Sequence, residues 1–353
     1  MDFTYLKNLI KLQMGDRRLF PRMAIYYVTG QCNFNCAYCE DFGQPRNATA
    51  LPSLPVEDAL RVLRIVRQGT DRLMLTGGEP LLYPEILPLV ERARRELKFR
   101  QLTLTTNGSL LPRAEALLPW VDRLIVSLDS VDAQQWSGVI RMSVETAQAV
   151  LDHIKHYATR QRRDRFRLIV NAVLSPETLP GAPALLEFCR QNRILVSFSP
   201  QMVNNWPRYE LITSPEYKRL IQKLIALKRR GAPIAGSLAY LHMLLDLRPF
   251  ACYPTLTPRI LPNGDLTYPC RPIEKSGHGH GGRPCNLLEV DLWIEAQAIS
   301  LAQYGQPPQV CNSCFQQCYA EPSLMQARPL GWLFEWLLFA ASRRADLASY
   351  APG

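Results

Sequence analysis

The sequence lacks three features that would each place it in a different class of protein. It opens at Met1-Asp2 without an apolar signal segment, which predicts a reducing cytoplasm where thiols bind metal rather than form disulfides. No basic stretch is interleaved with aromatic residues, so no nucleic acid partner is indicated. The apolar run near the C-terminus, 12 residues from 330 to 341, is shorter than the roughly twenty that cross a bilayer.

The composition is that of a soluble chain with a substantial core. Of the 353 residues, 47% are hydrophobic and 20% charged, and this length predicts about two domains. The net charge of +10 comes from 41 basic and 31 acidic residues, partly in runs such as 92–95, 160–167 and 228–230. A solvated helix face is the plain interpretation of each run, and an anionic partner is the alternative.

Nine of the ten cysteines fall into two groups, and only Cys189 stands alone, where we expect a small buried side chain. The first group is Cys32, Cys36 and Cys39 in QCNFNCAYCE. Three thiolates this close can hold one face of an iron–sulfur cube and leave its fourth iron without a protein ligand. A zinc knuckle is the alternative, but zinc needs four ligands, and neither a histidine nor a fourth cysteine lies nearby.

The CxxxCxxC spacing, with Tyr38 before the third cysteine, resembles the radical S-adenosylmethionine (radical SAM) superfamily. The resemblance implies a 4Fe–4S cluster that reductively cleaves SAM to methionine and a 5′-deoxyadenosyl radical. Such a radical abstracts hydrogen from an unactivated C–H bond. The resemblance also implies a one-electron donor such as flavodoxin or ferredoxin.

Strand and helix patterns alternate from residue 23 onward, with short links that predict a parallel sheet. Six β-rich segments are expected as strands, and they are MAIYYVTG, RLMLTG, QLTLTT, RLIVSL, RLIVNAVL and ILVSFS. The predicted class is α/β. By resemblance, the expected architecture is the partial (β/α)6 barrel of radical SAM enzymes, followed by a cysteine-rich domain.

The second strand ends in a GGEP motif, in which two glycines let the backbone approach a ligand closely. The carboxylate of Glu79 can form charge-assisted hydrogen bonds to an ammonium. Gly77, Gly78 and Glu79 match the superfamily motif that resembles a binding site for the amino group of SAM.

Further SAM contacts are expected at the ends of later strands. By resemblance, Ser127 and Asp129 meet the SAM ribose or carboxylate, although Asp129 can instead cap the following element. Arg141 is a second candidate for the SAM carboxylate. Asn107 and Asn171 are expected to reach the pocket, or else to satisfy backbone groups at the strand ends.

The second cysteine group lies in the last third of the chain and contains Cys252, Cys270, Cys285, Cys311, Cys314 and Cys318. The segment ILPNGDLTYP predicts a β-hairpin at its Asn-Gly turn, which returns the chain so that the first two cysteines approach one another. The later CxxC can then close a tetrahedral site.

This layout resembles the twitch or SPASM domains of radical SAM enzymes. Eleven residues separate Cys252 from Gly264, and five separate Gly264 from Cys270. We expect one auxiliary 4Fe–4S cluster, for which Cys318 can replace one ligand. The expected ligands are Cys252, Cys270, Cys311 and Cys314. Cys285 is expected to be a plain thiol, with a ligand or hydrogen donor as alternatives, and a zinc ribbon remains an alternative for the whole set.

Four segments follow from these patterns: an N-terminal amphipathic helix at 1–22, the barrel at 23–235, the auxiliary domain at 236–325 and an apolar C-terminal helix at 326–353. Residues 4–20 predict the first helix, which packs beneath the barrel or lies on the inner face of a membrane. The last helix packs on the barrel or lies in the membrane–water interface, with its tryptophans at the depth of the lipid headgroups. The histidines at 278 and 280 predict a flexible loop, with metal binding or acid–base chemistry as the alternative.

The function expected from these motifs is radical SAM chemistry on a peptide or small metabolite, with the auxiliary cluster aiding electron transfer or substrate binding. About twenty residues precede the first strand, too few for a fused leader-binding domain. A lipid or isoprenoid substrate is the first alternative. A non-enzymatic iron–sulfur or zinc protein is the second, but it gives the GGEP motif and Ser127 no role.

Overall fold

The structure is a computed structural model that describes residues 4–47, 49–161, 163–270, 283–307, 309–311 and 313–328. Its main sheet has the strand order β11-β10-β1-β2-β3-β4-β5-β6. Strands β1 to β6 pair in parallel, each with the next along the chain. They are β1 (Ala24–Thr29), β2 (Arg72–Gly77), β3 (Gln101–Thr106), β4 (Arg123–Ser127), β5 (Arg167–Leu174) and β6 (Leu195–Pro200). These are the six expected strands in the expected order, so the predicted α/β fold is confirmed.

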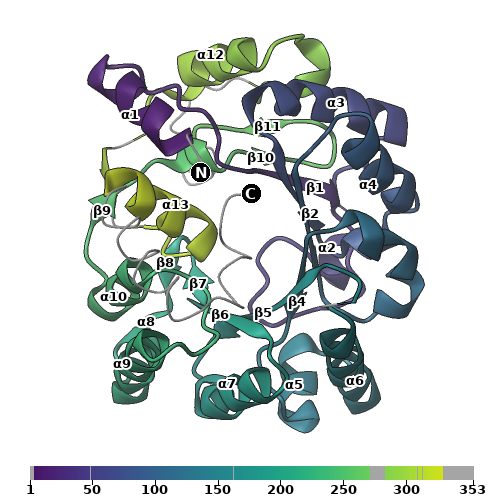
Figure 1. Ribbon diagram of the computed structural model, residues 1–353, viewed down its shortest axis with the longest axis vertical. Coiled ribbons are helices and arrows are strands. Elements are labelled where there is room, and N and C mark those ends of the chain that lie inside the picture. The colour runs from purple at the N-terminus through teal and green to yellow at the C-terminus, as the bar shows by residue number, and fades with distance from the viewer. Residues whose placement is uncertain are drawn as a thin grey trace.

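Helices cover the outer face of this curved sheet (Figure 1). They are α3 (Val56–Gly69), α4 (Ile86–Arg95), α5 (Ala133–Ile140), α6 (Val144–Arg160), α7 (Ala182–Gln191) and α9 (Pro215–Arg229). Each buries one face; in α3 the buried positions include Ala59, Leu63 and Val66, which helical spacing brings to one side. The link from β3 to β4 is a 3₁₀ helix, η2 (Leu111–Trp120). Pro119 within it has no N–H to donate to an α-helical ladder.

The predicted hairpin is confirmed, and it joins the barrel sheet. Strand β10 (Arg259–Ile260) pairs antiparallel with β11 (Leu266–Thr267), and Gly264 takes a φ of +90° in the turn. Strand β10 also pairs in parallel with β1, placing Arg259 opposite Ile25. The segment predicted as an auxiliary domain therefore extends the sheet of the predicted barrel, which the sequence patterns did not indicate.

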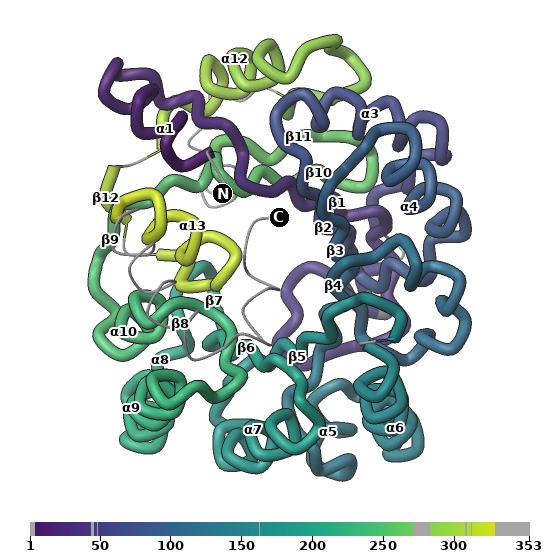
Figure 2. The backbone as a smooth tube through the Cα atoms, viewed as in Figure 1, coloured from purple at the N-terminus to yellow at the C-terminus, as the bar shows by residue number. Residues whose placement is uncertain are grey.

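Helix α12 (Trp293–Tyr304) lies beside α3 (Figure 1). The other C-terminal elements lie between the two ends of the sheet, β11 and β6 (Figures 1 and 2). They are α10 (Leu238–Asp246), β9 (Phe250–Ala251), β12 (Val310–Cys311) and α13 (Gln317–Ala327). Helix α13 is fixed there by buried polar contacts: the carboxylate of Glu321 accepts from the backbone N–H of Ser237 at 2.6 Å, and Ser323 Oγ accepts from Tyr253 N at 2.9 Å. Helix α13 thus brings the last cysteines toward the open side of the barrel.

The remaining short elements connect these parts. They are α2 (Gln44–Asn47), η1 (Pro80–Leu82), η3 (Leu179–Gly181), β7 (Met202–Val203), β8 (Trp206–Pro207), α8 (Tyr209–Ile212), η4 (Pro254–Leu256) and η5 (Leu287–Glu289). The histidine-containing loop at 278–280 and the apolar segment 330–341 lie outside the described residues. None of the described helices is long and apolar enough to span a bilayer.

Helix α1 (Thr4–Gln13) is shorter than the expected 4–20. It ends before Gly15, whose φ is +75°, and the side chain of Asn8 then holds the returning chain through two hydrogen bonds to the backbone of Phe20. Tyr5 packs in a small cluster with Leu19 and Leu256, so α1 packs on the protein as one alternative expected. An apolar stripe remains exposed at Leu6 and Ile10 of the same helix and at Met14 just after it, and membrane contact stays a prediction.

Candidate active site

The cysteine loop, residues 31–40, leaves the carboxyl end of β1, where loops of parallel α/β sheets carry functional groups. Cys32 is buried, while Cys36 and Cys39 are half-buried. The backbone N–H of Cys39 donates to the carbonyl of Cys36 at 3.1 Å, which closes a turn between them. The loop therefore presents three thiols within a short arc at the edge of the sheet.

Burial favours the neutral form of two of these thiols, Cys32 and Cys36. Burial raises the pKa of Cys32 to about 11. Burial also raises the pKa of Cys36, and the nearby Asp129 and the other two cysteines add to the shift. Iron supplies the positive charge that stabilises three neighbouring thiolates. This donor set fits the iron–sulfur cluster expected from the sequence.

Asparagine side chains fix the first half of the loop. Asn47 accepts from the backbone N–H of Cys32 at 3.0 Å and donates to its carbonyl at 2.9 Å. Asn107, at the end of β3, donates to Asn33 Oδ1 at 2.8 Å, and Asn33 donates to Ser109 Oγ at 2.9 Å. Asn107 thus contacts the cysteine loop itself, which neither of its expected roles described.

The GGEP motif lies directly against the loop, and its glycines permit this. The backbone N–H of Gly78 donates to Thr29 O at 2.9 Å, continuing the β1–β2 pairing. A Cβ on Gly77 would lie 2.3 Å from Thr29 O, and one on Gly78 would lie 2.3 Å from Gln31 O. Because real side chains do not approach so closely, only glycine fits at both positions.

Glu79 is fully buried beneath the loop. Its carboxylate accepts from Leu81 N at 3.0 Å, Thr106 Oγ1 at 2.8 Å and Asn107 N at 2.7 Å. Burial nevertheless raises the pKa of Glu79 to about 7. A carboxylate offers about four acceptor positions, so a position remains for a donor such as an ammonium group, and the contact with the SAM amino group stays a prediction.

The two residues expected at the end of β4 have different surroundings. Ser127 pairs in register with Asn171 of β5, and Asn171 lines a cavity of about 500 Å³ inside the barrel, called the main cavity below. Asp129 is 3% exposed, and its carboxylate accepts from Tyr38 Oη at 2.7 Å and from Val173 N at 2.8 Å. Burial raises the pKa of Asp129 to about 6. Both of its oxygens are bonded within the protein.

Arg141 lies at the C-terminal end of α5 in a left-handed conformation with a φ of +53°, and its side chain is exposed. The two preceding carbonyls, of Val139 and Ile140, accept from the backbone N–H groups of Ala37 and Asn35. The end of α5 therefore contacts the cysteine loop through its backbone. The contact between Arg141 and the SAM carboxylate stays a prediction.

The second cysteine set converges through a short antiparallel pair. Strand β12 pairs with β9 in the register Cys311 opposite Phe250, and Cys252 N donates to Gln309 O at 3.2 Å. A hydrogen bond with Cys311 and burial raise the pKa of Cys252, and Cys270 adds to the shift. Burial, with Cys270 as the next cause, raises the pKa of Cys314 to about 12. Cys270 and Cys311 are therefore electrostatic neighbours of both Cys252 and Cys314, and Cys318 is a further neighbour of Cys314.

The other two cysteines of this part of the chain have different surroundings. Cys318 accepts a hydrogen bond from Arg259 Nη2 at 3.5 Å and lines the main cavity. Cys285 is buried behind the hairpin, where its carbonyl accepts from Leu266 N at 2.8 Å. This surrounding agrees with the expectation of a plain thiol for Cys285, while the ligand set stays a prediction.

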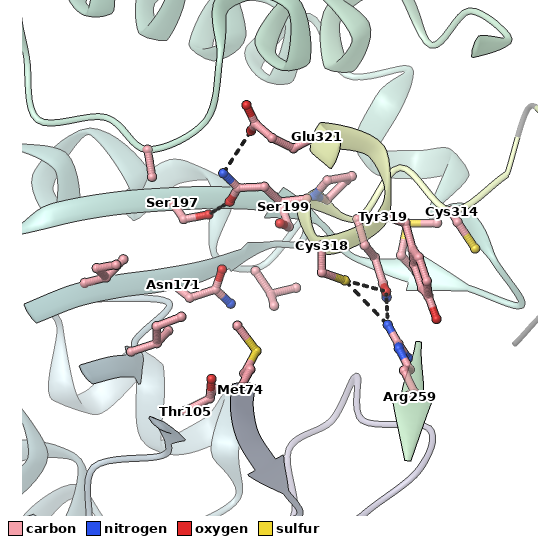
Figure 3. A pocket seen from close by; sticks show the side chains of 18 of the residues that line it. Met74, Thr105, Asn171, Ser197, Ser199, Arg259, Cys314, Cys318, Tyr319 and Glu321 are labelled. Carbon is pink, nitrogen blue, oxygen red and sulfur yellow. Dashed lines mark hydrogen bonds between the residues drawn. The ribbon is translucent and has the colours of Figure 1, made fainter. Parts of the chain in front are cut away.

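The main cavity, of about 500 Å³, connects the two cysteine sets. Tyr38 and Cys39 line it on the side of the cysteine loop, and Cys314 and Cys318 line it on the side of α13. Figure 3 shows Met74, Thr105, Asn171 and Ser197 on the barrel strands, facing Cys318, Tyr319 and Arg259. The buried hydroxyl of Thr105 on this wall has no hydrogen-bond partner among the residues that the structure describes.

Arg259 is a cavity residue that the sequence patterns missed, because a lone arginine in a short hairpin strand resembles an ordinary solvated residue. It is only 5% exposed. Its guanidinium lies 4.4 Å from the ring of Tyr319 and 5.9 Å from that of Tyr27, and Nη2 donates to Gln316 and Cys318. Its Nε is buried and has no hydrogen-bond partner within the described part of the chain. None of these contacts is a carboxylate.

Arg259 also borders a second cavity of about 410 Å³, between the hairpin and the segment after the cysteine loop. Tyr27, Phe42 and Arg46 line this cavity as well. Arg259 therefore lies at the boundary between the two cavities, and the larger of these two reaches both cysteine sets.

The fold and the cysteine loop together define a class of iron–sulfur enzymes built on a partial α/β barrel. The chain belongs to the radical SAM superfamily, whose family model matches residues 26–189. As a member, it is an enzyme that binds a 4Fe–4S cluster and SAM. Cys32, Cys36 and Cys39 fall within the matched range, as do the GGEP motif and Asp129.

Two curated relatives are named GTP 3′,8-cyclases. The protein of Marinobacter nauticus is 35% identical over 207 residues, which cover 56% of this chain and 60% of the relative. A GTP 3′,8-cyclase of Pseudomonas aeruginosa is 31% identical over 229 residues, covering 62% of this chain and 67% of the relative. The chain spans less than two thirds of the length of the first curated relatives it matches.

Solved structures show the same fold at low identity. SuiB of Streptococcus suis bound to S-adenosylmethionine has a TM-score of 0.60 at 21% identity, covering 82% of this chain and 68% of SuiB. The enzyme anSMEcpe with bound AdoMet has a TM-score of 0.55 at 13% identity, covering 79% and 80%. At these identities the likeness establishes the fold alone.

Proposed function

We propose that this protein uses radical SAM chemistry on a small anionic metabolite held between its two cysteine sets, with a purine nucleotide such as GTP as the first candidate. The observation that supports an anionic substrate is the buried guanidinium of Arg259 on the wall of the shared cavity. The curated relatives named for action on GTP support the choice of nucleotide.

The argument from Arg259 is one of charge. Burying a cation is costly unless it is paired, and its protein contacts here are two rings, an amide oxygen and a thiol. A phosphate or carboxylate can accept from a planar guanidinium in a bidentate geometry. The tyrosine rings hold the plane of the guanidinium in place, so the site is formed before its ligand arrives.

The residues of the cysteine loop and the GGEP motif would then act as follows. Cys32, Cys36 and Cys39 hold the cluster, which supplies the electron that cleaves SAM and yields a hydrogen-abstracting 5′-deoxyadenosyl radical. The remaining acceptor position of Glu79 receives the amino group of SAM. The enclosing walls of the cavity keep the substrate close and exclude water.

We further propose that Cys252, Cys270, Cys311 and Cys314 hold an auxiliary 4Fe–4S cluster. Because Cys314 lines the same cavity as Cys39, a substrate between them would lie near both clusters. The auxiliary cluster would bind the substrate or accept its electron, and the first cluster would receive its electron from flavodoxin or ferredoxin. Iron analysis decides between this set and the zinc alternative.

A peptide substrate, expected from the family resemblance, gains no support from the relatives' names. SuiB and anSMEcpe are described with bound peptides, but their identity of 21% or less limits the likeness to the fold. A lipid substrate has as its support the exposed stripe on α1, which lies outside the main cavity.

The test begins with anaerobic reconstitution and reduction, followed by measurement of 5′-deoxyadenosine with SAM alone and with added GTP. We expect GTP to raise the rate of its formation. Arg259→Met should raise the apparent Kd for GTP at least tenfold, because a charge-assisted hydrogen bond contributes about 1.5–3 kcal/mol. Arg259→Lys should retain part of the affinity, and the exposed Arg61→Met serves as the control.

Two results would count against the proposal at different levels. If SAM is cleaved but no nucleotide alters the rate or binds, the nucleotide is wrong while the radical chemistry stands. If GTP binds equally well to Arg259→Met, the anionic end of the substrate does not lie at Arg259.

A further inference from the structure

A hydrogen bond joins the middle of the cysteine loop to the barrel. Tyr38, one residue before the third cysteine, donates its phenolic O–H to Asp129 Oδ2 at 2.7 Å. The other oxygen, Oδ1, accepts from the backbone N–H of Val173 on β5 at 2.8 Å. Each oxygen of Asp129 therefore has a donor within the protein, and the residue is 3% exposed.

The position of this pair in the loop determines what it controls. The first part of the loop is held at Cys32 by Asn47 and at Asn33 by Asn107. Neither contact reaches the segment between Cys36 and Cys39. Among the described residues, that segment is joined to the rest of the protein by the backbone bond from Ala37 N to Val139 O at 2.8 Å and by the side-chain bond from Tyr38 to Asp129.

We infer that Asp129 is a positioning residue: it acts through Tyr38 to set the arrangement of Cys36 and Cys39, and therefore the direction in which the open iron of the cluster faces. The sequence resemblance assigned Asp129 to the SAM ribose or carboxylate instead. Residues that do not bind a metal themselves but hold its ligands in place orient those ligands. Mutation of such a residue costs about 10- to 100-fold in metal affinity or activity. This inference rests on the family and on the geometry of the loop, not on the proposed substrate.

The test compares Tyr38→Phe, Asp129→Asn and the double variant after anaerobic reconstitution, without substrate. The readouts are iron and sulfide per chain, the apparent Kd for SAM by equilibrium dialysis, and the change in the electron paramagnetic resonance spectrum when SAM is added. Asp132→Asn is the matched control, because it makes the same change three residues on, at the N-terminal cap of α5, where asparagine caps equally well.

We expect the two single variants to weaken SAM binding by about tenfold and to alter the spectrum in the same way. The double variant should be no worse than either, because both changes remove one interaction. If Asp129 instead contacts SAM directly, Asp129→Asn will lose affinity while Tyr38→Phe keeps it, and their effects will add; this result overturns the inference.

Folding is checked separately, by thermal unfolding of each variant before reconstitution. Tyr38→Phe removes only a hydroxyl and keeps the ring, so it tests the inference even if Asp129→Asn does not fold. Wild-type SAM affinity and an unchanged spectrum in Tyr38→Phe would refute the inference by themselves.

Discussion

At the scale of single residues, the buried carboxyl group of Glu79 links the chemistry of the site to the stability of the fold. Three protein donors contact it, yet burial raises its pKa from 4.5 to about 7. Between these two values the folded protein holds a proton that the unfolded chain has lost. Stability must therefore fall as pH rises through this window.

We predict that the free energy of unfolding contributed by Glu79 falls by about 3 kcal/mol between pH 4.5 and pH 7, from a shift of about 2.5 units at 1.36 kcal/mol each. Urea unfolding of the apoprotein at pH 5 and pH 7.5 measures the change. Glu79→Gln should show a flatter dependence than the wild type. The surface variant Glu91→Gln should keep the wild-type slope, and equal slopes in all three proteins would contradict the assignment.

Gly78 tests the contact between the GGEP motif and the cysteine loop. In Gly78→Ala the new Cβ would lie 2.3 Å from Gln31 O and 2.9 Å from the Cβ of Cys32, so the loop must move. We expect the variant to bind at least tenfold less iron at the first site under limiting iron. Gly138→Ala, in an exposed helical position with open space around it, should bind iron normally and gain about 1 kcal/mol of stability.

At the scale of elements, α1 shows how one helix can have a packed face and an exposed apolar face. Tyr5 is 5% exposed, contacts Arg22 through its ring and donates to Met325 Sδ at 3.3 Å. On the same helix, Ile10 is 53% exposed. The hydrophobic pattern alone does not separate these two positions, because both are apolar residues of an amphipathic helix.

We predict that Tyr5→Ala lowers the free energy of unfolding by about 3 kcal/mol, since it removes a buried ring that joins α1 to α13. Ile10→Ala should change it by no more than about 0.5 kcal/mol. Chemical denaturation of the two variants measures the difference. Equal effects would show that α1 does not pack as described.

At the scale of the whole molecule, the two cysteine sets form one functional unit because they share a cavity. The barrel supplies the first set from the end of β1. The hairpin and α13 bring Arg259 and the last cysteines to the same space. Loss of either set should therefore have a distinct effect on iron content and on chemistry.

Iron analysis after reconstitution should give about eight irons per chain for the wild type and about four each for Cys36→Ala and Cys314→Ala. Only Cys36→Ala should abolish SAM cleavage. Cys314→Ala should still release 5′-deoxyadenosine while losing substrate turnover. Cys285→Ser should keep all of its iron, and about four irons in the wild type would leave one cluster and favour zinc or no metal at the second set.

The sequence predicted the local parts of this molecule well. The six strands have the expected order, and the Asn-Gly hairpin forms where expected. Hydrophobic periodicity and turn residues act over a few positions, so a single sequence reveals them. The pairing of β10 with β1 joins residues more than two hundred positions apart, and no local pattern signals it.

The same division holds at the active site. The sequence by itself determined the three cysteines and the glycines of the GGEP motif, because metal ligation and close backbone approach each demand one residue type at a fixed spacing. The tertiary structure decided that Asp129 bonds to Tyr38, that Asn107 holds the cysteine loop, and that Arg259 is buried on the cavity wall. These roles depend on which side chains meet across the barrel, and burial and pairing arise only when distant segments pack together.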